Sequence, residues 1–456
     1  MKKLIALLLA VVMVMGLAAC GSKTTTETKA PTEAKVDTPA TEAKTDAPAA
    51  AGSVYYLNFK PEFDQALQGL AASYTEKTGV PVKVVTAASG DYSNTLNAQM
   101  GKDGAPTVYN IGNMSGLKDW DEYALDLTGT ALAGELATND FNLYNEAGEL
   151  KAMGYCYESF GIIVNTKLLA DAGHSLDEIK DFASLKAVAD DIHARAAELG
   201  FDAFSSAGLD GSSSWRFSGH LANMPLFYEF RDDKVTAQPA AIKGTYLDAF
   251  KNVWDLYTTD SATTGAALTT ATGDASEAEF GQGKAVFFQN GSWEYANLVT
   301  SDDKGFKMNP EDLAMIPIYC GVEGEEKAGL CCGTENCWAV NKNAKEEDIQ
   351  ASLDFLYWLV TDPDASAVLV EQLGADPFKS CPASANKFIV DGNALLADGK
   401  YAVTWAFNYT PNVDSWRATV VTALAAYSAD PTDANWEAVK TAFVDGWAIE
   451  YKTVNG

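Results

Sequence analysis

Cysteine and histidine provide most protein metal ligands and many nucleophile–base pairs, and this chain has seven cysteines and three histidines. His174, His193 and His220 form no H-x-x-H or H-E-x-x-H pair. The segment Cys331–Cys337 lacks the C-x2-C spacing of a zinc site and has no histidine nearby in sequence. No G-x-S-x-G elbow, P-loop or G-x-G-x-x-G turn is present. We therefore expect a protein that is not an enzyme, with no metal site and no cofactor.

Apart from Cys20, the cysteines permit two interpretations. In an extracytoplasmic protein they can form a disulfide, but buried thiols that pack as small apolar groups fit equally well. Spacing alone does not give the pairing. These cysteines are Cys156, Cys320, Cys331, Cys332, Cys337 and Cys381.

The composition limits the partners of the chain. It has 456 residues, with 33 Lys and Arg against 62 Asp and Glu and a formal net charge of −29. Such acidity argues against nucleic acid and against docking on anionic lipid, because both need a basic surface. A neutral or cationic partner fits better. The length exceeds what one hydrophobic core usually supports, which predicts two lobes.

The first 20 residues have the pattern of an export signal. Lys2 and Lys3 precede an apolar run, Leu4–Met15, that is too short to span a bilayer. The following Leu17-Ala18-Ala19-Cys20-Gly21 resembles a bacterial lipobox, in which the cysteine is diacylated and becomes the mature N-terminus. We expect a signal peptide over residues 1–20 and a lipid anchor at Cys20, since two acyl chains hold a protein stably on a membrane.

Residues 21–52 consist mainly of Thr, Ala, Lys, Glu, Asp and Pro, without any aromatic residue. A segment of this composition cannot bury enough apolar surface to offset its ordering entropy. We expect it to be a disordered tether between the anchor and the globular chain.

The globular part begins with alternating strands and helices. The patterns predict strands at 54–59, 80–86 and 107–111, with helices at 63–78 and 93–100 between them. Gly79 is expected to end the first helix. This alternation predicts an α/β fold with a mostly parallel sheet.

Short polar segments follow each of these strands. Ligands of parallel sheets bind beyond the carboxyl ends of the strands. The three ends are residues 60–62, 88–92 and 112–114. We expect them to form one wall of a cleft, with Glu62, Asp91 and Asn113 as candidate polar contacts.

Four segments from residue 54 onward resemble the extracellular solute-binding proteins of ATP-driven (ABC) carbohydrate importers, the group that includes maltose-binding protein. Residues 74–82 are similar to the family's "kkTGIkV" stretch, and 154–169 to its first crossing strand. Residues 280–293 are similar to "F..GkaAM.inGsW". The fourth segment comprises 313–318, 338–342 and the helix at 349–360. The sequence departs from the pattern at Gly154 and Val164, where Pro and Tyr are usual.

The resemblance implies a periplasmic-binding-protein-like fold of two α/β lobes with the ligand between them. It assigns residues 53–158 and about 316–375 to the first lobe. Residues about 159–315 and 376–456 then form the second. Hinge crossings are expected at 157–162 and 315–318, with a third near 374–377.

A sugar needs flat aromatic rings for its C–H face, and planar polar groups for its hydroxyls. The resemblance places Trp293 as a stacking aromatic. It also gives Trp215 and Arg216 a lining position, and Trp416 that of the late stacking aromatic in maltose-binding protein. Core packing for Trp416 and a surface ion pair for Arg216 remain open.

Among the carboxylates, Glu158 is the strongest candidate, because it stands where the family example has a sugar-binding Glu. A hinge salt bridge is the alternative. Asp91 could instead cap the helix that begins near Ser93. Glu62, Asn113, Glu335 and Asn336 lie on predicted loops near the cleft.

The sequence thus predicts a monomeric, lipid-anchored receptor on the outer face of a bacterial cell membrane. It would bind a carbohydrate, in our interpretation a short oligosaccharide, and deliver it to ABC permease subunits after hinge closure. Two alternatives stay open: a binding protein for a cationic solute such as a polyamine, and a surface glycosidase with paired carboxylates.

Overall fold

The computed structural model describes residues 52–87, 91–139, 141–206, 208–235, 237–302, 304–335, 337–374 and 377–456. The expected signal peptide, the lipidation site at Cys20 and almost all of the tether lie outside these residues. Within the described ranges, every helix is too short or too polar to cross a membrane.

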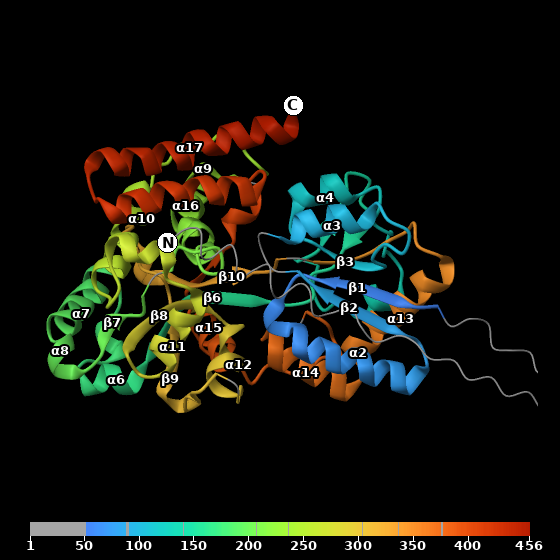
Figure 1. The fold of residues 1–456 in the computed structure, drawn as a ribbon, viewed down its shortest axis with the longest axis horizontal. Coiled ribbons are helices and arrows are strands. Elements are labelled where there is room, and N and C mark those ends of the chain that lie inside the picture. The colour runs from blue at the N-terminus through green and yellow to red at the C-terminus, as the bar shows by residue number, and fades with distance from the viewer. Residues whose placement is uncertain are drawn as a thin grey trace, which may run out of the picture. The chain divides into compact units, whose positions relative to one another are not determined.

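The first sheet has the strand order β11-β3-β1-β2. Figure 1 shows β3, β1 and β2 side by side. Its strands are β1 (Val54–Asn58), β2 (Val82–Thr86), β3 (Val108–Ile111) and β11 (Cys337–Val340). β1 runs parallel to β2 and β3, whereas β11 is antiparallel to β3. The predicted parallel α/β arrangement of the first three strands is confirmed.

Helices cover both faces of this sheet because successive side chains of a strand point to opposite faces. Trp338 and Val340 of β11 pack in one core with α2 (Asp64–Thr78), α13 (Glu346–Thr361) and α14 (Pro363–Leu373). The alternate residues, Cys337 and Ala339, pack in another with α3 (Tyr92–Met100) and α4 (Met114–Trp120). α2 ends at Gly79, whose φ of 77° is left-handed, as predicted for a glycine cap.

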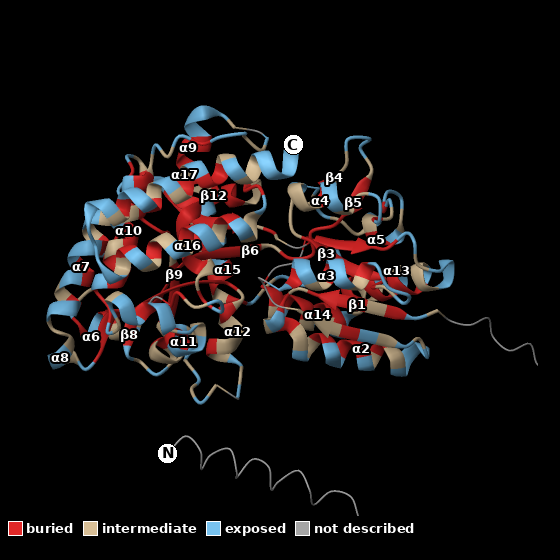
Figure 2. Cartoon of the chain, turned by 45° about the horizontal axis from the view of Figure 1, so that its top comes forward, coloured by how far each residue is buried: buried red, intermediate tan, exposed pale blue. Residues whose placement is uncertain are grey.

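The second sheet has the strand order β12-β10-β6-β8-β7, and β9 also pairs with β6. β6 (Glu158–Asn165) is its centre, and all eight of its residues are buried (Figure 2). The other strands are β7 (Asp202–Phe204), β8 (Ala285–Gly291), β9 (Leu313–Ile316), β10 (Ala328–Gly333) and β12 (Tyr401–Thr404).

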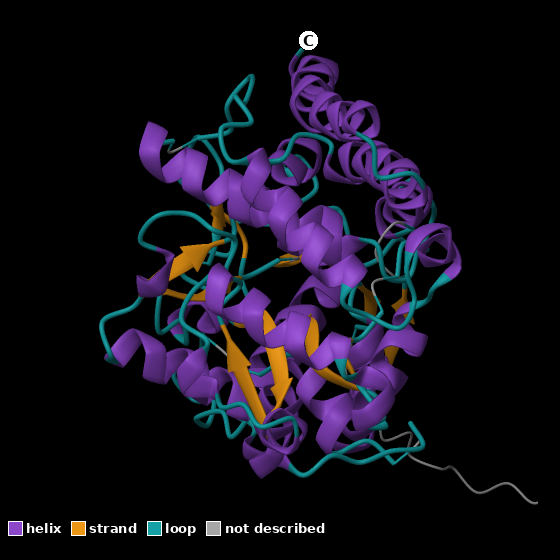
Figure 3. Ribbon diagram, turned by 90° about the vertical axis from the view of Figure 1, so that its left-hand side faces the viewer, coloured by secondary structure: helices purple, strands orange, loops and turns teal. Residues whose placement is uncertain are grey.

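Helices cover the strands of the second sheet as well (Figure 3). They are α6 (Thr166–Asp171), α7 (Phe182–Ala194), α8 (Ala196–Leu199), α9 (Ala222–Asp233), α10 (Leu247–Thr259), α11 (Gly273–Gly281), α12 (Glu294–Val299), α15 (Lys387–Ala397), α16 (Val413–Ala429) and α17 (Asp433–Asn455). The remaining short elements are α5 (Ala131–Gly134), β4 (Leu143–Tyr144) and β5 (Leu150–Ala152).

The chain passes from the first set of cores to the second at the start of β6. Tyr155 stacks on Trp338 at 4.5 Å in a core of the first sheet, whereas Phe160 packs in the main core of the second. The change therefore falls inside the predicted crossing at 157–162. Later in the chain, Phe378 still packs with the first sheet, and Phe388 packs with the second.

One predicted crossing differs from the structure. Residues 316–375 were expected in the first lobe, but Ile318, Tyr319 and Cys320 pack in the main core of the second sheet. β10 also pairs with β6 and β12 there. The chain leaves this sheet after Gly333 and enters the first at Cys337. The strands that β10 pairs with, β6 and β12, are far from it in sequence. The residues of β10 alone therefore do not indicate which sheet it joins.

The six described cysteines are all thiols, with no disulfide among them. Five are buried, and Cys331 lies with its Sγ 3.6 Å from Met224 Sδ. The sequence left open a disulfide or buried thiols that pack as small apolar groups, and the structure agrees with the second interpretation.

Candidate functional site

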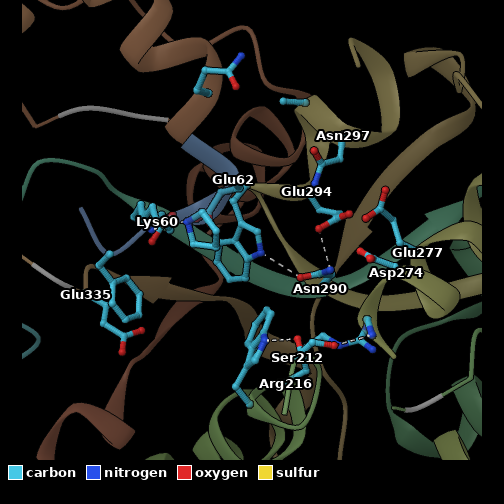
Figure 4. Close-up of a pocket in the computed structure, with 18 of the residues that line it drawn as sticks. Lys60, Glu62, Ser212, Arg216, Asp274, Glu277, Asn290, Glu294, Asn297 and Glu335 are labelled. Atoms are coloured by element: carbon cyan, nitrogen blue, oxygen red, sulfur yellow. Dashed lines mark hydrogen bonds and ion pairs between the residues drawn. The ribbon is translucent and has the colours of Figure 1, made fainter. Parts of the chain in front are cut away.

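A cavity of about 1060 Å³ is lined by residues from the segments that carry both sheets (Figure 4). Phe59–Glu62 follow β1, Asp91 precedes α3 and Glu158 begins β6. The opposite wall comes from β8, α11 and α12 and from the turn around Trp215. Its volume is at the top of the usual range for ligand pockets, roughly 300–1,000 Å³, so the cavity can hold a ligand of several rings.

Lys60 and Glu158 form a buried ion pair in this cavity. Lys60 Nζ donates to Glu158 Oε1 at 2.7 Å and lies 3.6 Å from Glu62 Oε1. Burial raises the pKa of Glu158, and Lys60 opposes that rise. For Lys60, burial alone would lower the pKa, but the carboxylate of Glu158 outweighs it and the pKa is well above the usual value. The pair joins the segment after β1 to the crossing strand, and Glu158 both lines the cavity and makes the salt bridge considered from sequence.

Trp293 and Trp215 form an aromatic group on the opposite wall. Their ring centroids are 6.0 Å apart, and His220 lies within 5.3 Å of each. Trp293 Nε1 donates to Asn290 Oδ1 at 3.1 Å, which fixes the ring. Burial, with Arg417 and Arg216, holds the pKa of His220 well below its usual value, so this imidazole is neutral at pH 7.

Trp405 and Phe407 extend the aromatic lining after β12. Their rings stack at 5.4 Å, and Trp405 also stacks on Phe160 of β6. Trp405 Nε1 is buried and has no hydrogen-bond partner among the described residues. Arg417 lines the cavity beside them, 5.2 Å from the centre of the Phe407 ring. This corner therefore offers both a ring surface and N–H donors.

Arg216 is almost completely buried at the base of the cavity. It donates to Ser213 Oγ at 2.7 Å and to the Gln289 carbonyl at 3.3 Å, while its Nε has no described partner. Burial lowers its pKa to about 10, which leaves it charged at neutral pH. The surface ion pair considered from sequence is therefore wrong.

Glu277 and Glu294 lie together at one side of the cavity (Figure 4). Glu277 Oε2 accepts from Lys304 at 3.0 Å, and Glu294 Oε2 accepts from Asn290 Nδ2 at 3.0 Å. Burial raises the pKa of Glu294 to about 8, and the neighbouring carboxylate of Glu277 contributes. Glu294 is therefore largely protonated at pH 7.

Of the nine residues proposed from sequence, the structure brings seven into the cavity: Glu62, Asp91, Glu158, Trp215, Arg216, Trp293 and Glu335. Asp91 precedes α3, but its side chain makes no capping hydrogen bond. Burial raises the pKa of Glu335, and Arg417 opposes that rise. Asn336 is outside the described residues.

Trp416 and Asn113 do not line the cavity. Trp416 is 0% exposed, packs on Phe443 and donates from Nε1 to the Phe443 carbonyl at 2.9 Å. Asn113 caps α4 by accepting from the backbone N–H groups of Ser115 and Gly116 at 2.9 and 3.0 Å. The proposed ligand role for Trp416 is therefore corrected to core packing, and that for Asn113 to helix capping.

Several lining residues were missed from sequence: Lys60, His220, Glu277, Asn290, Glu294, Trp405, Phe407 and Arg417. Lys60 comes just before Pro61 and Glu62 at the end of a strand. The rule that ligands bind beyond the carboxyl ends of parallel strands therefore applies to it as well. Glu294 directly follows Trp293. The others carry no local signal, because they are brought to the cavity by the packing of distant elements.

The cavity lining combines many charged side chains with aromatic rings. Eight acidic and four basic side chains are among its described lining residues, with five aromatic rings apart from His220. In the part of the chain that the structure describes, no three His, Cys, Asp or Glu side chains are grouped to hold a metal ion. Rings, amides, carboxylates and guanidinium groups are the contacts that a polyhydroxylated ligand requires.

Comparison with known families agrees with this geometry. Residues 69–386 match the family described as bacterial extracellular solute-binding protein. The chain belongs to this family. The resemblance stated from sequence is thus confirmed at the level of the family, which is a family of binding proteins. Among curated protein sequences, none matches the chain.

Solved structures of other solute-binding proteins share the fold of this one. The solute-binding protein RafE in complex with raffinose has a TM-score of 0.67 at 16% identity, covering 88% of this chain and 99% of that one. The GacH receptor of Streptomyces glaucescens, solved unliganded and with acarbose, gives 0.61 at 18%, covering 89% and 99%. A sugar transporter from Bacillus licheniformis in complex with stachyose gives 0.64 at 16%, covering 87% and 100%. The predicted two-lobe α/β fold class is confirmed.

The matched range includes only part of the binding cavity of this solute-binding protein. Glu158, Trp215 and Trp293 fall inside residues 69–386, whereas Lys60 and Arg417 fall outside. The first and last segments of the cavity wall therefore lie outside the matched range.

Proposed function

We propose that this solute-binding protein is a lipid-anchored extracellular receptor that binds a short oligosaccharide between its two lobes and delivers it to an ABC permease. The observation that carries the proposal is the cavity itself, in which the rings of Trp215, Trp293 and Trp405 lie among buried, hydrogen-bonding carboxylates and arginines. Stacked rings and planar polar groups together are the usual means of holding a pyranose.

The similar structures support the carbohydrate class. Those structures were solved with raffinose, stachyose and acarbose, each of which has several rings. A cavity of about 1060 Å³ accommodates ligands of this size. We propose that closure occurs when one ligand contacts Glu158 or Asp91 on one side and Trp293 on the other, because only contacts to both lobes shift the equilibrium.

A thermal-shift screen tests the ligand class. The purified protein without residues 1–20 is heated with raffinose, stachyose, maltotriose, xylotriose and spermidine, each in excess. A ligand that binds only the folded protein raises the melting temperature by mass action. A shift with an oligosaccharide supports the proposal. A shift with spermidine and none with the sugars would replace it with the cationic-solute alternative.

Incubation with the same oligosaccharides separates a receptor from a glycosidase. We expect the sugars to remain intact by chromatography after prolonged incubation at the protein concentration of the binding assay. Cleavage would show that carboxylates of the cavity act on a glycosidic bond, and the receptor proposal would then be wrong.

The anchor and the permease partnership are proposals from sequence. Cys20→Ser should release the protein into the medium and abolish labelling by a fatty-acid precursor, because the lipidated thiol is lost. Recovery of the unaltered protein in the medium without label would contradict the anchor. Reconstitution with its permease in vesicles should make ATP hydrolysis depend on the bound sugar.

A further inference from the structure

One end of the cavity is strongly acidic. Asp274 and Glu277 on α11 face Glu294 and Asn297 on α12, and Lys304 lies beside them. We call these five residues the acidic end. Figure 4 shows Asp274, Glu277, Glu294 and Asn297 on one side of the pocket and Glu335 on the other.

Two carboxyl oxygens of the acidic end are buried without a partner. Glu277 is 7% exposed and Glu294 is 6% exposed. Their Oε2 atoms are occupied by Lys304 and Asn290, but neither Oε1 has a hydrogen-bond partner among the described residues. Since buried polar atoms are nearly always hydrogen-bonded in folded proteins, these oxygens are open to a hydrogen-bonding group of a ligand.

The local charge balance also calls for a cation. The charged groups that act on Arg216 include Glu294, Asp210, Glu277 and Glu279, all negative. Within the acidic end, Lys304 is the cation and already pairs with Glu277. When Glu294 is ionised, the carboxylates of Asp274, Glu277 and Glu294 outnumber Arg216 and Lys304 by one, and a bound cation would balance the charge.

We propose that the acidic end binds the protonated amine of an amino sugar, so that the preferred ligand is an oligosaccharide with a free amino group on the unit that reaches Glu277 and Glu294. This inference rests on the proposed function and deepens it. An ammonium group has three donors and no acceptor, and it matches the free oxygens of Glu277 and Glu294 together with the carboxylate of Asp274.

Other occupants match these atoms less well. A hydroxyl group could accept from protonated Glu294 and donate to Glu277, but it brings no positive charge to balance the carboxylates when Glu294 is ionised. A carboxylated sugar would bring a further negative charge to an acidic site. The described residues also group no metal-binding set of His, Cys, Asp and Glu. A small organic cation carried on a sugar ring satisfies both the oxygens and the charge.

The protonation of Glu294 is consistent with an unfilled cation site. The groups that face it are Asn290 from β8, Asp274 and Glu277 from α11, Asn297 from its own helix, Lys304 and Arg216. Burial and Glu277 raise its pKa to about 8 in the absence of a ligand. A bound ammonium would favour the carboxylate, so that amine binding should drive Glu294 to release its proton.

Sugars that differ at one position test the proposal. Glucosamine, galactosamine and mannosamine are each compared with the parent hexose and with the N-acetyl derivative. The β-1,4-linked trisaccharides of glucosamine, glucose and N-acetylglucosamine are added as a matched set. Titration calorimetry at pH 7 should give at least tenfold tighter binding for the amino member of a set than for its two neutral partners. Glu294→Gln and Glu277→Gln should remove most of this preference.

Glu335→Gln is the control, because it also removes an acidic side chain from the cavity wall but at the other side. It should leave the ratio of amino to neutral affinity unchanged, whatever its effect on overall affinity. If neutral sugars bind as tightly as their amino partners in every set, the inference is wrong and the oligosaccharide function stands. If none of these sugars nor raffinose or stachyose binds, the proposed function fails and the inference fails with it. A preference that survives Glu294→Gln and Glu277→Gln would place the amine elsewhere and overturn the assignment.

Discussion

The ring of Trp293 lies directly over Gly291, two residues earlier at the end of β8. A Cβ atom added at Gly291 would come within 2.2 Å of Cη2 of the ring. Only a residue without a side chain leaves this space, so the last residue of β8 provides the surface on which the indole rests. The Asn290 side chain then holds the indole N–H at 3.1 Å. Asn290 and Gly291 at the end of β8 thus orient the Trp293 ring in the cavity wall.

Trp293→Ala should lower oligosaccharide affinity at least tenfold while leaving the fold intact. The change removes a partly buried ring from the cavity wall, at the edge of the core of the second sheet, so a stacking surface is lost and the fully buried core is kept. Calorimetric titration with the sugar found in the thermal-shift screen measures the affinity, and circular dichroism checks the fold. Trp358→Ala is the matched control, because this Trp packs on Tyr74 and does not line the cavity. Unchanged affinity in the Trp293 variant would remove it from the binding site.

Gly291→Ala should weaken binding through the position of Trp293 alone. The added methyl group displaces the ring, and we expect a loss of affinity of severalfold, measured by the same titration. Gly69→Ala is the control: a Cβ there meets no atom within 4 Å, and an alanine in the middle of α2 should stabilise the protein by up to about 1 kcal/mol. If both variants bind the sugar like the parent protein, the contact between Gly291 and Trp293 does not set the ring orientation.

Lys60 and Glu158 should show strong coupling in a double-mutant cycle. Lys60→Met leaves a buried carboxylate unpaired, and Glu158→Gln leaves the buried ammonium with only the longer contact to Glu62 Oε1 at 3.6 Å. Each should lower the free energy of unfolding by about 3–5 kcal/mol. The double variant should lose much less than the sum of the two, because no uncompensated charge remains. Urea unfolding monitored by tryptophan fluorescence gives the four values. Additive losses would mean that the two groups do not depend on each other.

Much of the fold could be predicted because its signals are local. The apolar runs of β1, β2 and β3 and the glycine after α2 each specify their element within a few residues. The ends of those strands then indicated where Glu62 and Asp91 would lie, by the general rule for parallel sheets. Asn113 satisfied the same rule but does not line the cavity. Its side-chain Oδ1 instead accepts from the backbone N–H groups at the N-terminus of α4.

The rest of the site depends on contacts that no short segment contains. Trp416 and Trp405 are both aromatic residues of the C-terminal segment, and their sequence surroundings do not separate them. Trp416 faces Phe443 of α17 and is buried, whereas Trp405 faces the cavity over Gly333 of β10. Which of the two lines the cavity is therefore decided by the packing of α17 and by the sheet that β10 joins.

The stability of the unliganded protein should fall as the pH rises from about 4.5 to 8, and Glu294 should be a main cause. Burial raises the pKa of its carboxyl group from 4.5 to about 8 in the folded protein, so the folded state holds a proton that the unfolded state has released. Stability falls with pH wherever the folded state binds more protons, by at most about 1.4 kcal/mol per pH unit for one group. Below pH 4.5 the carboxyl group is protonated in both states, so the stability no longer changes with pH on account of Glu294.

Glu294→Gln isolates this contribution, because the amide is neutral at every pH and keeps the shape of the protonated acid. The variant should match the parent protein near pH 4.5 and exceed it in unfolding free energy at pH 8 to 9, with a visibly flatter curve between. Glu311→Gln, at an exposed position before β9, should give a curve parallel to that of the parent. Chemical unfolding at half-unit pH steps provides the three curves. If the Glu294→Gln curve runs parallel to that of the parent protein as well, the carboxyl group is ionised in the folded state at neutral pH, and the acidic end then carries a full extra negative charge before any ligand binds.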